Sequence, residues 1–523
     1  MAEDKEALQE KSRTEYSAIN AAVSLAAQMI AILTGFVNRV IFVRNLSGGY
    51  VGINGLFLNI LNILSLSELG IGTAITYALY RPVAEGDIPR QKVLMGIYRR
   101  FYQIVAAAVM LLGLAVLPFM DMLMKERPDV EHITLIYLLY LFNAAASYLL
   151  SYKRAMIEVS QKLYIVSLYT TLFLVLQNIL QMVILETTGN FLAFLIVGIC
   201  STLAGNFCIS RKADSMFPFL KEHTRERLSA EDKQSLGRNI RATILHRIGG
   251  VVVNHTDNLI LSAFVGVISV GIYSNYYLLI GSVRQLMDRV FQGISASVGN
   301  LGATESPQRV ERIYKVAFFI GQWLYGICTI CLYELLNPFV ELFFGEEYLF
   351  ERPVVFILCI TFFILGTRKT FSTFWSSLGL FWIDRYKALA EAVANIVFSV
   401  FLVQRWGVFG VFAGTVLSMF PLALWLEPWL FHRFYLQKAV GPFLLRQTGD
   451  MAVTGLIWLV VDRLCTLVNG PLLWVLVARA LICMGLGNLL LLLAHFRRKE
   501  FKTVVRRGTA LIQKYFRGRK SAA

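Results

Sequence analysis

Charged residues are scarce in this sequence. Asp, Glu, Lys and Arg together make up 16% of the 523 residues, whereas 56% are apolar and the mean hydropathy is +0.60. Apolar stretches of roughly 20 residues recur from one end to the other, and each can cross a hydrocarbon core of about 30 Å. A soluble protein would have to bury every one of them. The composition therefore excludes a soluble globular protein and indicates a membrane protein.

Catalytic signatures are also missing. The sequence has 6 histidines and contains no H-E-x-x-H motif, no glycine-rich phosphate-binding loop and no nucleophile elbow. His246 and His255 are better explained as packed or hydrogen-bonded residues than as proton carriers. We therefore expect a protein that is not an enzyme and needs no metal or organic cofactor. Energy would have to come from the substrate gradient or from an ion gradient, with H+ or Na+ as the candidate coupling ion.

Cysteine is sparse, and its 7 residues lie almost entirely inside apolar segments. Cys328 and Cys331 form a C-x-x-C pair, but neither a histidine nor a second pair lies near them in the sequence. These thiols are predicted to pack as small apolar residues.

Fourteen apolar segments predict an all-α integral membrane protein with about fourteen membrane-spanning helices. The expected spans are 19–43, 51–80, 101–120, 133–151, 163–185, 190–209, 242–265, 270–299, 316–336, 354–378, 388–403, 407–430, 451–468 and 472–495. Residues 1–18 are polar, and the first span is longer than a signal-peptide core and lacks a small-residue cleavage site. These residues are therefore expected to stay as a cytoplasmic tail.

Basic residues are distributed unevenly between the loops. If the N-terminus is cytoplasmic, about three quarters of the 50 Lys and Arg lie in cytoplasmic segments. The positive-inside rule then predicts a multi-pass plasma-membrane protein with both termini in the cytoplasm. It also explains the net charge of +16 without a nucleic-acid partner. The basic tail 496–523 alternates apolar and cationic residues, which predicts contact with anionic lipid at the membrane surface.

The predicted helices fall into two groups of six. A charged cytoplasmic loop at 210–241 separates an N-lobe (19–209, helices 1–6) from a C-lobe (242–430, helices 7–12), and helices 13 and 14 follow at 451–495. A shift of 219 residues aligns VGINGLFLNIL, which begins at Val51, with VGIYSNYYLLI, which begins at Val270. Because six is an even number, two such repeats share one orientation and can face each other across a central cavity.

Ionisable residues inside the predicted spans are the candidate functional residues, because a charge at mid-membrane costs about 3 kcal/mol and normally faces water or other helices. The cationic ones are Arg39, Arg247, Arg284, Arg289, Arg368, Lys369 and Arg479, and the acidic companions are Glu68, Asp257, Asp288 and Glu391. On this count cations exceed anions, which predicts a cavity that favours an anionic ligand. Glu68, Asp257 and Asp288 are candidate ion-coupling groups, since nearby charges tune the proton affinity of a carboxylate.

Arg39 lies near the end of the first predicted helix, in the run GFVNRVIFVRNL. Its side chain can extend to the nearby membrane interface, which is the simpler explanation. Its helical face favours a cavity instead, because small and polar residues recur there at spacings of four and seven. This stripe consists of Asn20, Ser24, Gln28, Gly35 and Arg39.

Arg284 lies at the midpoint of its predicted span, far from either membrane surface. The residues that share its helical face are Tyr273, Tyr277, Gly281, Asp288 and Ser295. Asp288 follows Arg284 by four residues, so an ion pair between the two is the alternative to a ligand-binding role.

Three further basic residues complete the candidate set. Arg368 and Lys369 are adjacent in the tenth span, where two cations exceed what one nearby carboxylate would neutralise. Arg247 lies on a polar stripe of the seventh span and marks either its cytoplasmic end or the wall of the cavity.

Three stretches of the sequence resemble a known family. They are VGINGLFLNILNILSLSELGIGTAITYALYRPVAEGD at 51–87, HTDNLILSAFVGVISVGIYSNYYLLI at 255–280 and GLFWIDRYKALAEAVANIVFSV at 379–400. In order and spacing they are similar to bacterial polysaccharide-biosynthesis flippases of the Wzx type. That family belongs to the MOP superfamily, which also contains the MATE multidrug antiporters and the lipid II flippases.

The resemblance implies a two-lobed bundle of twelve helices plus two in the bacterial plasma membrane. Its implied function is to move undecaprenyl-diphosphate-linked oligosaccharide, a capsule or exopolysaccharide precursor, from the cytoplasmic to the outer leaflet by alternating access. The implied partners are this lipid-linked glycan, membrane lipids, a polysaccharide polymerase and glycosyltransferases.

The resemblance also implies that cationic residues line the cavity. The matched positions are Arg39, Arg284, Arg368 and Lys369. Arginine suits a diphosphate because its planar guanidinium can donate two hydrogen bonds to phosphate oxygens. Tyr273, Tyr276, Tyr277 and Trp375 are candidates for stacking on sugar rings, although aromatic side chains in helix bundles more often pack against one another.

Two other classes of function stay open. A MATE-like exporter of drugs or metabolites, coupled to an ion gradient, would need a cavity of net acidic character for cationic drugs, which the excess of in-span cations disfavours. A membrane scaffold for a glycan-assembly complex would tolerate neutralisation of every in-span cation, which a transporter would not.

Overall fold

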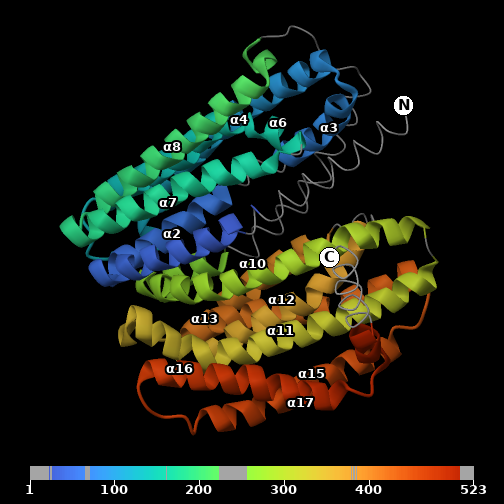
Figure 1. The fold of residues 1–523 in the computed structure, drawn as a ribbon. Coiled ribbons are helices and arrows are strands. Elements are labelled where there is room, and N and C mark those ends of the chain that lie inside the picture. Colours follow the sequence, from blue (N-terminus) through green and yellow to red (C-terminus); the bar gives the residue numbers. More distant parts are fainter. Residues whose placement is uncertain are drawn as a thin grey trace, which may run out of the picture. The chain divides into compact units, whose positions relative to one another are not determined.

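The structure is a computed structural model, and it consists of α-helices (Figure 1). It describes residues 26–64, 71–160, 162–222, 256–304, 306–378 and 386–506, together with residues 23, 380, 383 and 384. No β-strand occurs in these ranges, and nine of the helices within them are long and apolar enough to cross a membrane. The predicted all-α membrane fold with about fourteen spanning helices is confirmed.

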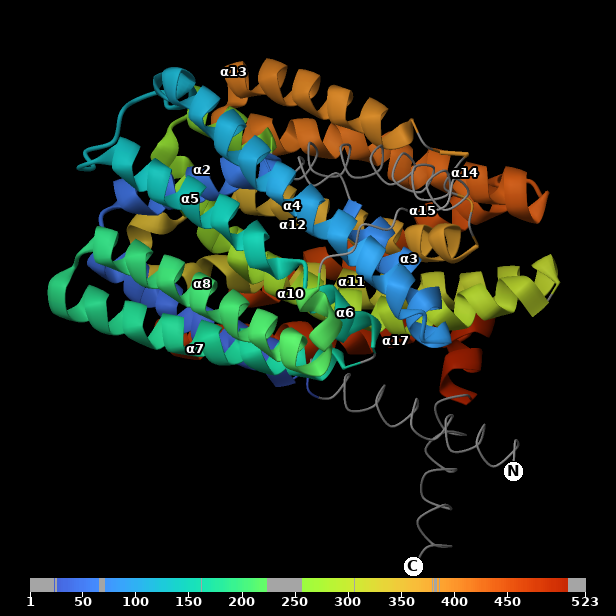
Figure 2. The same ribbon diagram turned by 90° about the horizontal axis from the view of Figure 1, so that it is seen from above.

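The chain divides into two compact units, Met1–Ser274 and Asn275–Ala523. The helices of the first unit are Ala26–Asn45, α2 (Gly48–Leu64), α3 (Ile71–Glu85), α4 (Ile88–Val116), α5 (Ile133–Ser151), α6 (Arg154–Val159), α7 (Leu163–Thr188) and α8 (Phe191–Met216). Residues 256–264 are also helical, and α10 (Val267–Thr304) begins in this unit. Within the unit α5 packs against both α4 and α8, and Figure 2 shows α7 running beside α8.

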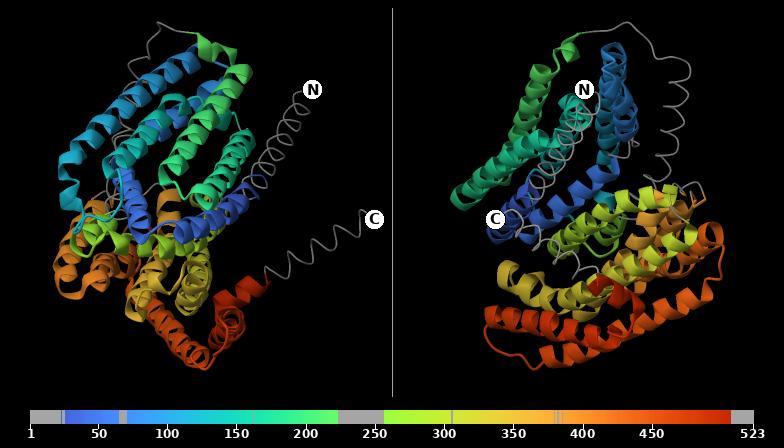
Figure 3. Two further views of the ribbon diagram at one scale, coloured as in Figure 1. Left: turned by 90° about the vertical axis from the view of Figure 1, so that its left-hand side faces the viewer. Right: turned by 45° about the vertical axis from the view of Figure 1, so that its right-hand side comes forward.

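The second unit contains the rest of α10 and the helices that follow. They are α11 (Pro307–Phe344), α12 (Arg352–Ser377), α13 (Lys387–Pro421), α14 (Glu427–Leu430) between two π-helical segments, α15 (Gly441–Cys465), α16 (Leu472–Leu481) and α17 (Asn488–His495). Here α11 contacts α12, α15 and α16, and α12 contacts α13. Figure 3 shows α15 and the arm α16–α17 as a hairpin, coloured orange to red.

One glycine separates the spans predicted at 388–403 and 407–430, which appear as the single helix α13. Gly407 has φ 52° and ψ −130°, a non-helical conformation that interrupts the helix and reverses the chain. The two arms then approach closely, since a Cβ on Gly410 would lie 2.3 Å from the carbonyl oxygen of Leu402. The division into two spans was therefore correct, and glycine is what permits both the turn and the contact.

The predicted internal repeat is visible in the helix boundaries. α2 begins at Gly48 and α10 at Val267, which is 219 residues later. The same interval separates the starts of α4 at Ile88 and α11 at Pro307, and those of α5 at Ile133 and α12 at Arg352. Corresponding helices in the two halves of the chain thus begin at the same spacing along the sequence.

Equivalent residues of the repeat also touch each other inside the first unit. Gly52 of α2 and Gly271 of α10 are 219 residues apart, and a Cβ on Gly271 would lie 2.9 Å from the backbone nitrogen of Gly52. A Cβ on Gly52 would lie 2.3 Å from the carbonyl oxygen of Val267. The backbones of α2 and α10 meet here with no room for a side chain.

Substitution of Gly52 by alanine is therefore expected to destabilise the protein by about 1–3 kcal/mol, because the added methyl group must displace backbone atoms. The matched control is Gly96→Ala in α4, where a Cβ would meet nothing within 4 Å. It should leave stability unchanged or raise it by about 0.5–1 kcal/mol. Thermal unfolding of the purified variants measures both. Equal midpoints for the two variants would contradict the close crossing.

Candidate functional site

The most strongly bonded group of buried charges joins α12, α13 and α14. Arg368 of α12 donates two parallel hydrogen bonds to Glu391 of α13, from Nη1 to Oε1 and from Nη2 to Oε2, both of 2.6 Å. Its Nε donates to Oε1 of Glu427 in α14, also at 2.6 Å. The side chains of the two glutamates are only 2% and 1% exposed. Three charge-assisted hydrogen bonds thus fix the guanidinium between two helices.

Lys387 and Asp384 extend this ionic network. Lys387 Nζ lies 3.0 Å from Oε1 of Glu427 and 2.6 Å from Oδ2 of Asp384. The network then contains two cations and three carboxylates, so it presents no excess positive charge. This corrects the prediction for Arg368, because the hydrogen bonds that would bind a diphosphate are already made to carboxylates.

Lys369 is directed toward α10 rather than toward this network. Its Nζ lies 2.6 Å from Oδ1 of Asp288, and the two side chains are 31% and 30% exposed. Asp288 therefore pairs with Lys369, not with Arg284 four residues before it. Lys369 is a partly exposed cation that already has one carboxylate partner, which weakens its candidacy as an anion ligand.

Arg284 differs from Arg368, Lys369 and Arg479, the other in-span cations singled out in the second unit whose side chains the structure describes. It lies half-buried near the middle of α10, and it forms no ion pair with any residue that the structure describes. Arg284 and Asp288 lie near Tyr325 of α11, on which both act electrostatically. The guanidinium thus lies at mid-helix without an ion-pair partner among the described residues.

The sequence count of in-span charges was incomplete. It left out the carboxylates Glu334, Glu427 and Asp462 and the exposed cation Arg463, all of which fall inside the predicted spans. Glu334 lies 3.9 Å from Arg479 in the structure. The excess of cations over anions is therefore small. The case for an anionic ligand rests on Arg284, which has no ion pair within the described part of the chain, and no longer on the total charge.

Arg39 is tied to the protein in the first unit. Its Nη2 donates a hydrogen bond of 3.5 Å to the carbonyl oxygen of Gly271, and its guanidinium carbon lies 5.4 Å from the ring centroid of Phe42. Of the polar stripe proposed for its helix, Asn20 and Ser24 lie outside the described residues. Arg39 is half-buried, and it binds the first turns of α10.

Two of the four aromatic candidates are core residues. Trp375 is 3% exposed and stacks on Phe371 with ring centroids 5.0 Å apart. Tyr276 is fully buried, and its hydroxyl donates to Asn337 at 2.6 Å. A sugar ring has no access to either side chain, which corrects these two predictions. Tyr273 is half-buried and Tyr277 is 48% exposed, so both stay candidates.

Of the remaining residues predicted to have a functional role, some are described by the structure and others are not. Asp257 is 8% exposed at the start of the helical segment 256–264, and it has interaction partners there. Arg247 and Glu68 lie outside the described residues, as do the two histidines of the seventh span and the side chain of Arg289.

The first unit contains a polar cavity that sequence reasoning missed. It measures about 270 Å³ and is lined from the helix Ala26–Asn45, α2, α5, α7 and α8. Its polar lining residues are Asn38, Asn54, Tyr140, Asn143, Gln177, Asn178 and Gln181. The run LQNILQM at 176–182 was the available signal, since it places three amides within one turn of an otherwise apolar helix.

An apolar groove of about 520 Å³ lies in the second unit between α11, α12 and α15. Among its lining residues are Ile330, Tyr333, Phe356 and Trp458, and the last three form mutual aromatic contacts with centroids 5.2–6.1 Å apart. None of the described residues that line this groove carries a charge.

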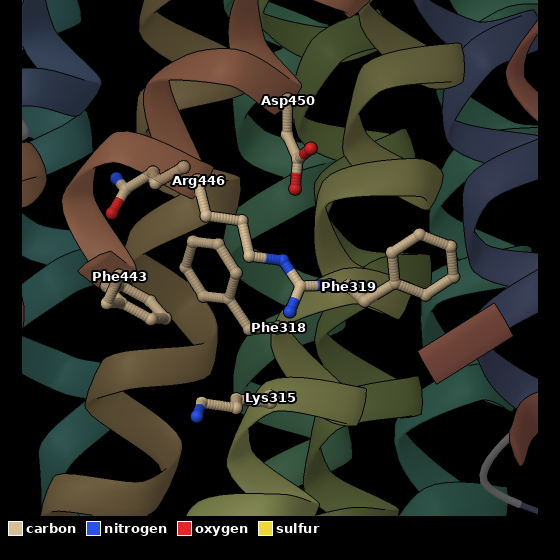
Figure 4. A pocket seen from close by; sticks show the side chains of 7 residues that line it. Lys315, Phe318, Phe319, Phe443, Arg446 and Asp450 are labelled. Atoms are coloured by element: carbon tan, nitrogen blue, oxygen red, sulfur yellow. The ribbon is translucent and has the colours of Figure 1, made fainter. Parts of the chain in front are cut away.

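The start of the basic C-terminal tail is docked onto the bundle. Arg446 of α15 donates hydrogen bonds of 2.7 and 2.5 Å to the two carboxylate oxygens of Glu500, and Arg498 pairs with Asp450. Figure 4 shows the Arg446 and Asp450 side chains entering a small pocket beside Phe318 and Phe319 of α11. Arg498 and Glu500 of the tail thus bind protein, whereas Phe496 and Val505 are each 46% exposed. Contact of the tail with lipid stays a prediction, and residues 507–523 lie outside the described residues.

The Arg446–Glu500 pair predicts a pH dependence of stability. The hydrogen bonds from Arg446 hold the pKa of the Glu500 carboxyl below its ordinary value. A carboxyl whose pKa is lowered by folding stabilises the protein above its unfolded pKa, and this contribution disappears as the pH falls through the lowered value. Because Arg446 is 36% exposed, we expect about 1 kcal/mol or less. Glu500→Gln should therefore lower the thermal midpoint at neutral pH and not at strongly acidic pH. A midpoint difference that does not change with pH would contradict the assignment.

Comparison with known proteins identifies the fold. No family model matches the chain, and no curated protein is significantly similar to it in sequence. Among solved structures, a lipid II flippase, MurJ, in an inward closed conformation aligns with a TM-score of 0.64 and 14% identity, over 94% of this chain and 100% of the other. An inward-facing multidrug resistance MATE family transporter of the MOP superfamily aligns with a TM-score of 0.60 and 15% identity, over 77% and 96%. A mutant of the Vibrio cholerae MATE transporter VcmN gives 0.56 and 12%, over 82% and 99%. The chain therefore has the fold of MOP superfamily proteins.

Proposed function

We propose that the protein moves a lipid-linked oligosaccharide that carries a diphosphate, of the undecaprenyl-diphosphate type, from the cytoplasmic to the outer leaflet by alternating access. The observation that carries this proposal is the guanidinium of Arg284 at the middle of α10, which forms no ion pair with any described residue. Burying a charge at this depth is costly unless it has a partner. A transiently bound anion of the substrate supplies that partner, and a planar guanidinium fits phosphate oxygens well.

The apolar groove supports a lipid substrate. A long prenyl chain needs an apolar surface beside the path of its headgroup, and the groove between α11, α12 and α15 offers about 520 Å³ without a charged group. Leu456 and Leu459 at this groove are 63% and 49% exposed, so it opens on the outside of the unit. A chain in the groove can stay in contact with the bilayer.

The structural neighbours support the same choice. The lipid II flippase aligns over 94% of this chain. The unaligned remainder of the chain is shorter than the segment that follows Val440, so it cannot account for that whole segment. The match therefore includes part of α15–α17, the helices that border the groove. The two MATE structures align over 77% and 82% of the chain.

The test is a deletion of the gene in its own host. Lipid-linked repeat units are expected to accumulate on the cytoplasmic side, where a membrane-impermeant glycosidase added to intact cells cannot reach them. Normal export of repeat units by the deletion strain would contradict the proposal. Complementation with the wild-type gene controls for polar effects on neighbouring genes.

The alternative function is ion-coupled export of drugs or metabolites. The observation in its favour is the set of carboxylates within the spans, which is larger than the sequence count suggested. Asp257 and Asp288 are the described candidates for binding H+ or Na+. Increased sensitivity of the deletion strain to cationic drugs, with normal glycan export, would favour this function over the flippase.

A further inference from the structure

The polar cavity of the first unit is lined by amides and a phenol and by no charged residue among those that the structure describes. Its polar side chains come from four helices, so only the folded unit brings them together. At about 270 Å³ it has room for about nine water molecules of roughly 30 Å³ each, or for a single pyranose ring. The cavity is therefore of a size and chemistry that suit a small neutral polar group.

The orientation of the amides at the cavity is fixed by one backbone carbonyl. Gln181 Nε2 donates to the carbonyl oxygen of Phe194 at 3.0 Å, so Gln181 Oε1 must accept. Asn38 Nδ2 donates to that Oε1 at 3.0 Å and also to Asn178 Oδ1 at 3.1 Å. Both donor hydrogens of Asn38 are therefore used, and its remaining atom at the site is the acceptor Oδ1.

Two acceptor oxygens at the cavity are left without a hydrogen bond from any described residue. They are Oδ1 of Asn38 and Oδ1 of Asn143, and both are buried. The Asn38 side chain is 91% buried, since its exposed fraction is 9%. A buried carbonyl oxygen without a donor costs about 1–3 kcal/mol. Two such oxygens in one cavity indicate that a molecule bound there supplies the missing hydrogen-bond donors.

Several polar residues of the cavity are only partly buried. Asn54, Asn143 and Gln177 are half-buried. The polar lining residues lie between about 6 and 11 residues from the ends of their helices at Asn45, Gly48, Ile133 and Thr188, that is about 9–17 Å. The distribution of basic residues predicts that these ends face outward.

We infer that this amide cavity binds one uncharged sugar residue of the transported glycan. Sugar hydroxyls donate to the oxygens of Asn38 and Asn143 and can accept from amide groups around them. The absence of charged groups from the lining disfavours phosphate and charged drugs alike. The inference rests on the proposed function for its substrate, and it assigns one sugar residue of that substrate to the first unit.

The decisive variant is Asn143→Leu. No hydrogen bond is lost when the Asn143 oxygen is removed, so thermal stability should stay equal or increase while sugar binding decreases. The matched control is Asn206→Leu in α8, because the Asn206 amide donates to Ser147 O at 3.2 Å and does not line the cavity. It should lose stability and keep sugar binding.

Binding is measured on the full-length protein in nanodiscs by saturation-transfer NMR. The probes are the methyl glycosides of glucose, galactose, mannose and N-acetylglucosamine, each offered separately. At least one should bind the wild type and the Asn206→Leu variant, with at least tenfold weaker binding to Asn143→Leu. Absence of binding by all four, or equal binding by all three proteins, would overturn the inference. So would a thermal stabilisation by Na+ or K+ without sugar that Asn143→Leu abolishes, since the cavity would then hold a cation.

This experiment separates the inference from the proposed function because free glycosides need no transport. If glycoside binding depends on Asn143 but the deletion strain exports glycan normally, the sugar site is supported and the proposed flippase function is rejected. If no glycoside binds but lipid-linked units accumulate on the cytoplasmic side in that strain, only the sugar site is rejected.

Discussion

The Arg368→Leu variant is expected to lose about 3–5 kcal/mol of stability, the largest structural effect in this chain. Glu391 and Glu427 are 2% and 1% exposed, and removal of the guanidinium leaves Glu391 without its cation. Glu427 keeps Lys387 at 3.0 Å. The loss is therefore dominated by one buried carboxylate with no partner. Chemical or thermal unfolding in detergent measures it.

A double-mutant cycle sharpens this prediction. Arg368→Leu combined with Glu391→Leu should recover much of the stability, because the unpaired carboxylate is removed as well. Lys369→Leu is the matched control at the next position. Its pair with Asp288 is about 30% exposed at both ends, so about 1 kcal/mol or less is expected. Similar losses for Arg368→Leu and Lys369→Leu would contradict the structural role assigned to Arg368.

The largest functional effect is expected from Arg284→Ala. A charge-assisted hydrogen bond contributes about 1.5–3 kcal/mol, which corresponds to roughly a 10- to 150-fold loss of transport. Stability should change little, because Arg284 forms no ion pair with the described residues. Arg284→Lys keeps the charge but not the planar fork, so partial transport is expected.

The control for Arg284 is Arg405→Ala, which removes an exposed arginine beside Phe401 of α13. It should transport like the wild type. Loss of folded protein in Arg284→Ala, or transport by it at the wild-type rate, would contradict the proposed diphosphate contact. Full function after neutralisation of every in-span cation would instead favour a scaffold.

Much of the fold could be predicted from sequence because membrane spans depend on local composition. The span predicted at 133–151 coincides with α5, and a break was placed correctly at Gly407. The repeat was suggested by a short alignment, and the helix starts at Gly48 and Val267 support it. These features depend on hydropathy and on single glycines, which a sequence displays directly.

The pairing of charges could not be predicted in the same way. Arg368 is 23 residues from Glu391 and 59 from Glu427, so only the packing of α12, α13 and α14 brings the three together. The sequence shows that a cation lies within a span, but not whether a carboxylate of another helix reaches it. For this reason the sequence predicted the same role for Arg284 and Arg368. Of these two residues, only Arg284 stays a candidate for binding a ligand.

Aromatic and amide residues show the same limit. Trp375 was chosen as a stacking residue, yet its ring is covered by the core around Phe371. The amides of α7 attracted no attention, although they line a cavity together with Asn38 and Asn143. Which face of a helix meets a cavity is decided by its neighbours, and no pattern within one helix contains that information.

The central claim is that the protein carries a lipid-linked, diphosphate-bearing glycan across the bilayer through Arg284. The most direct measurement uses proteoliposomes with undecaprenyl-diphosphate-linked oligosaccharide labelled by a fluorophore on its sugar, quenched from outside by dithionite. With the wild type, quenching should proceed beyond the outer-leaflet fraction, and with Arg284→Ala it should stop near that fraction. Wild-type quenching no greater than in protein-free liposomes would contradict the account.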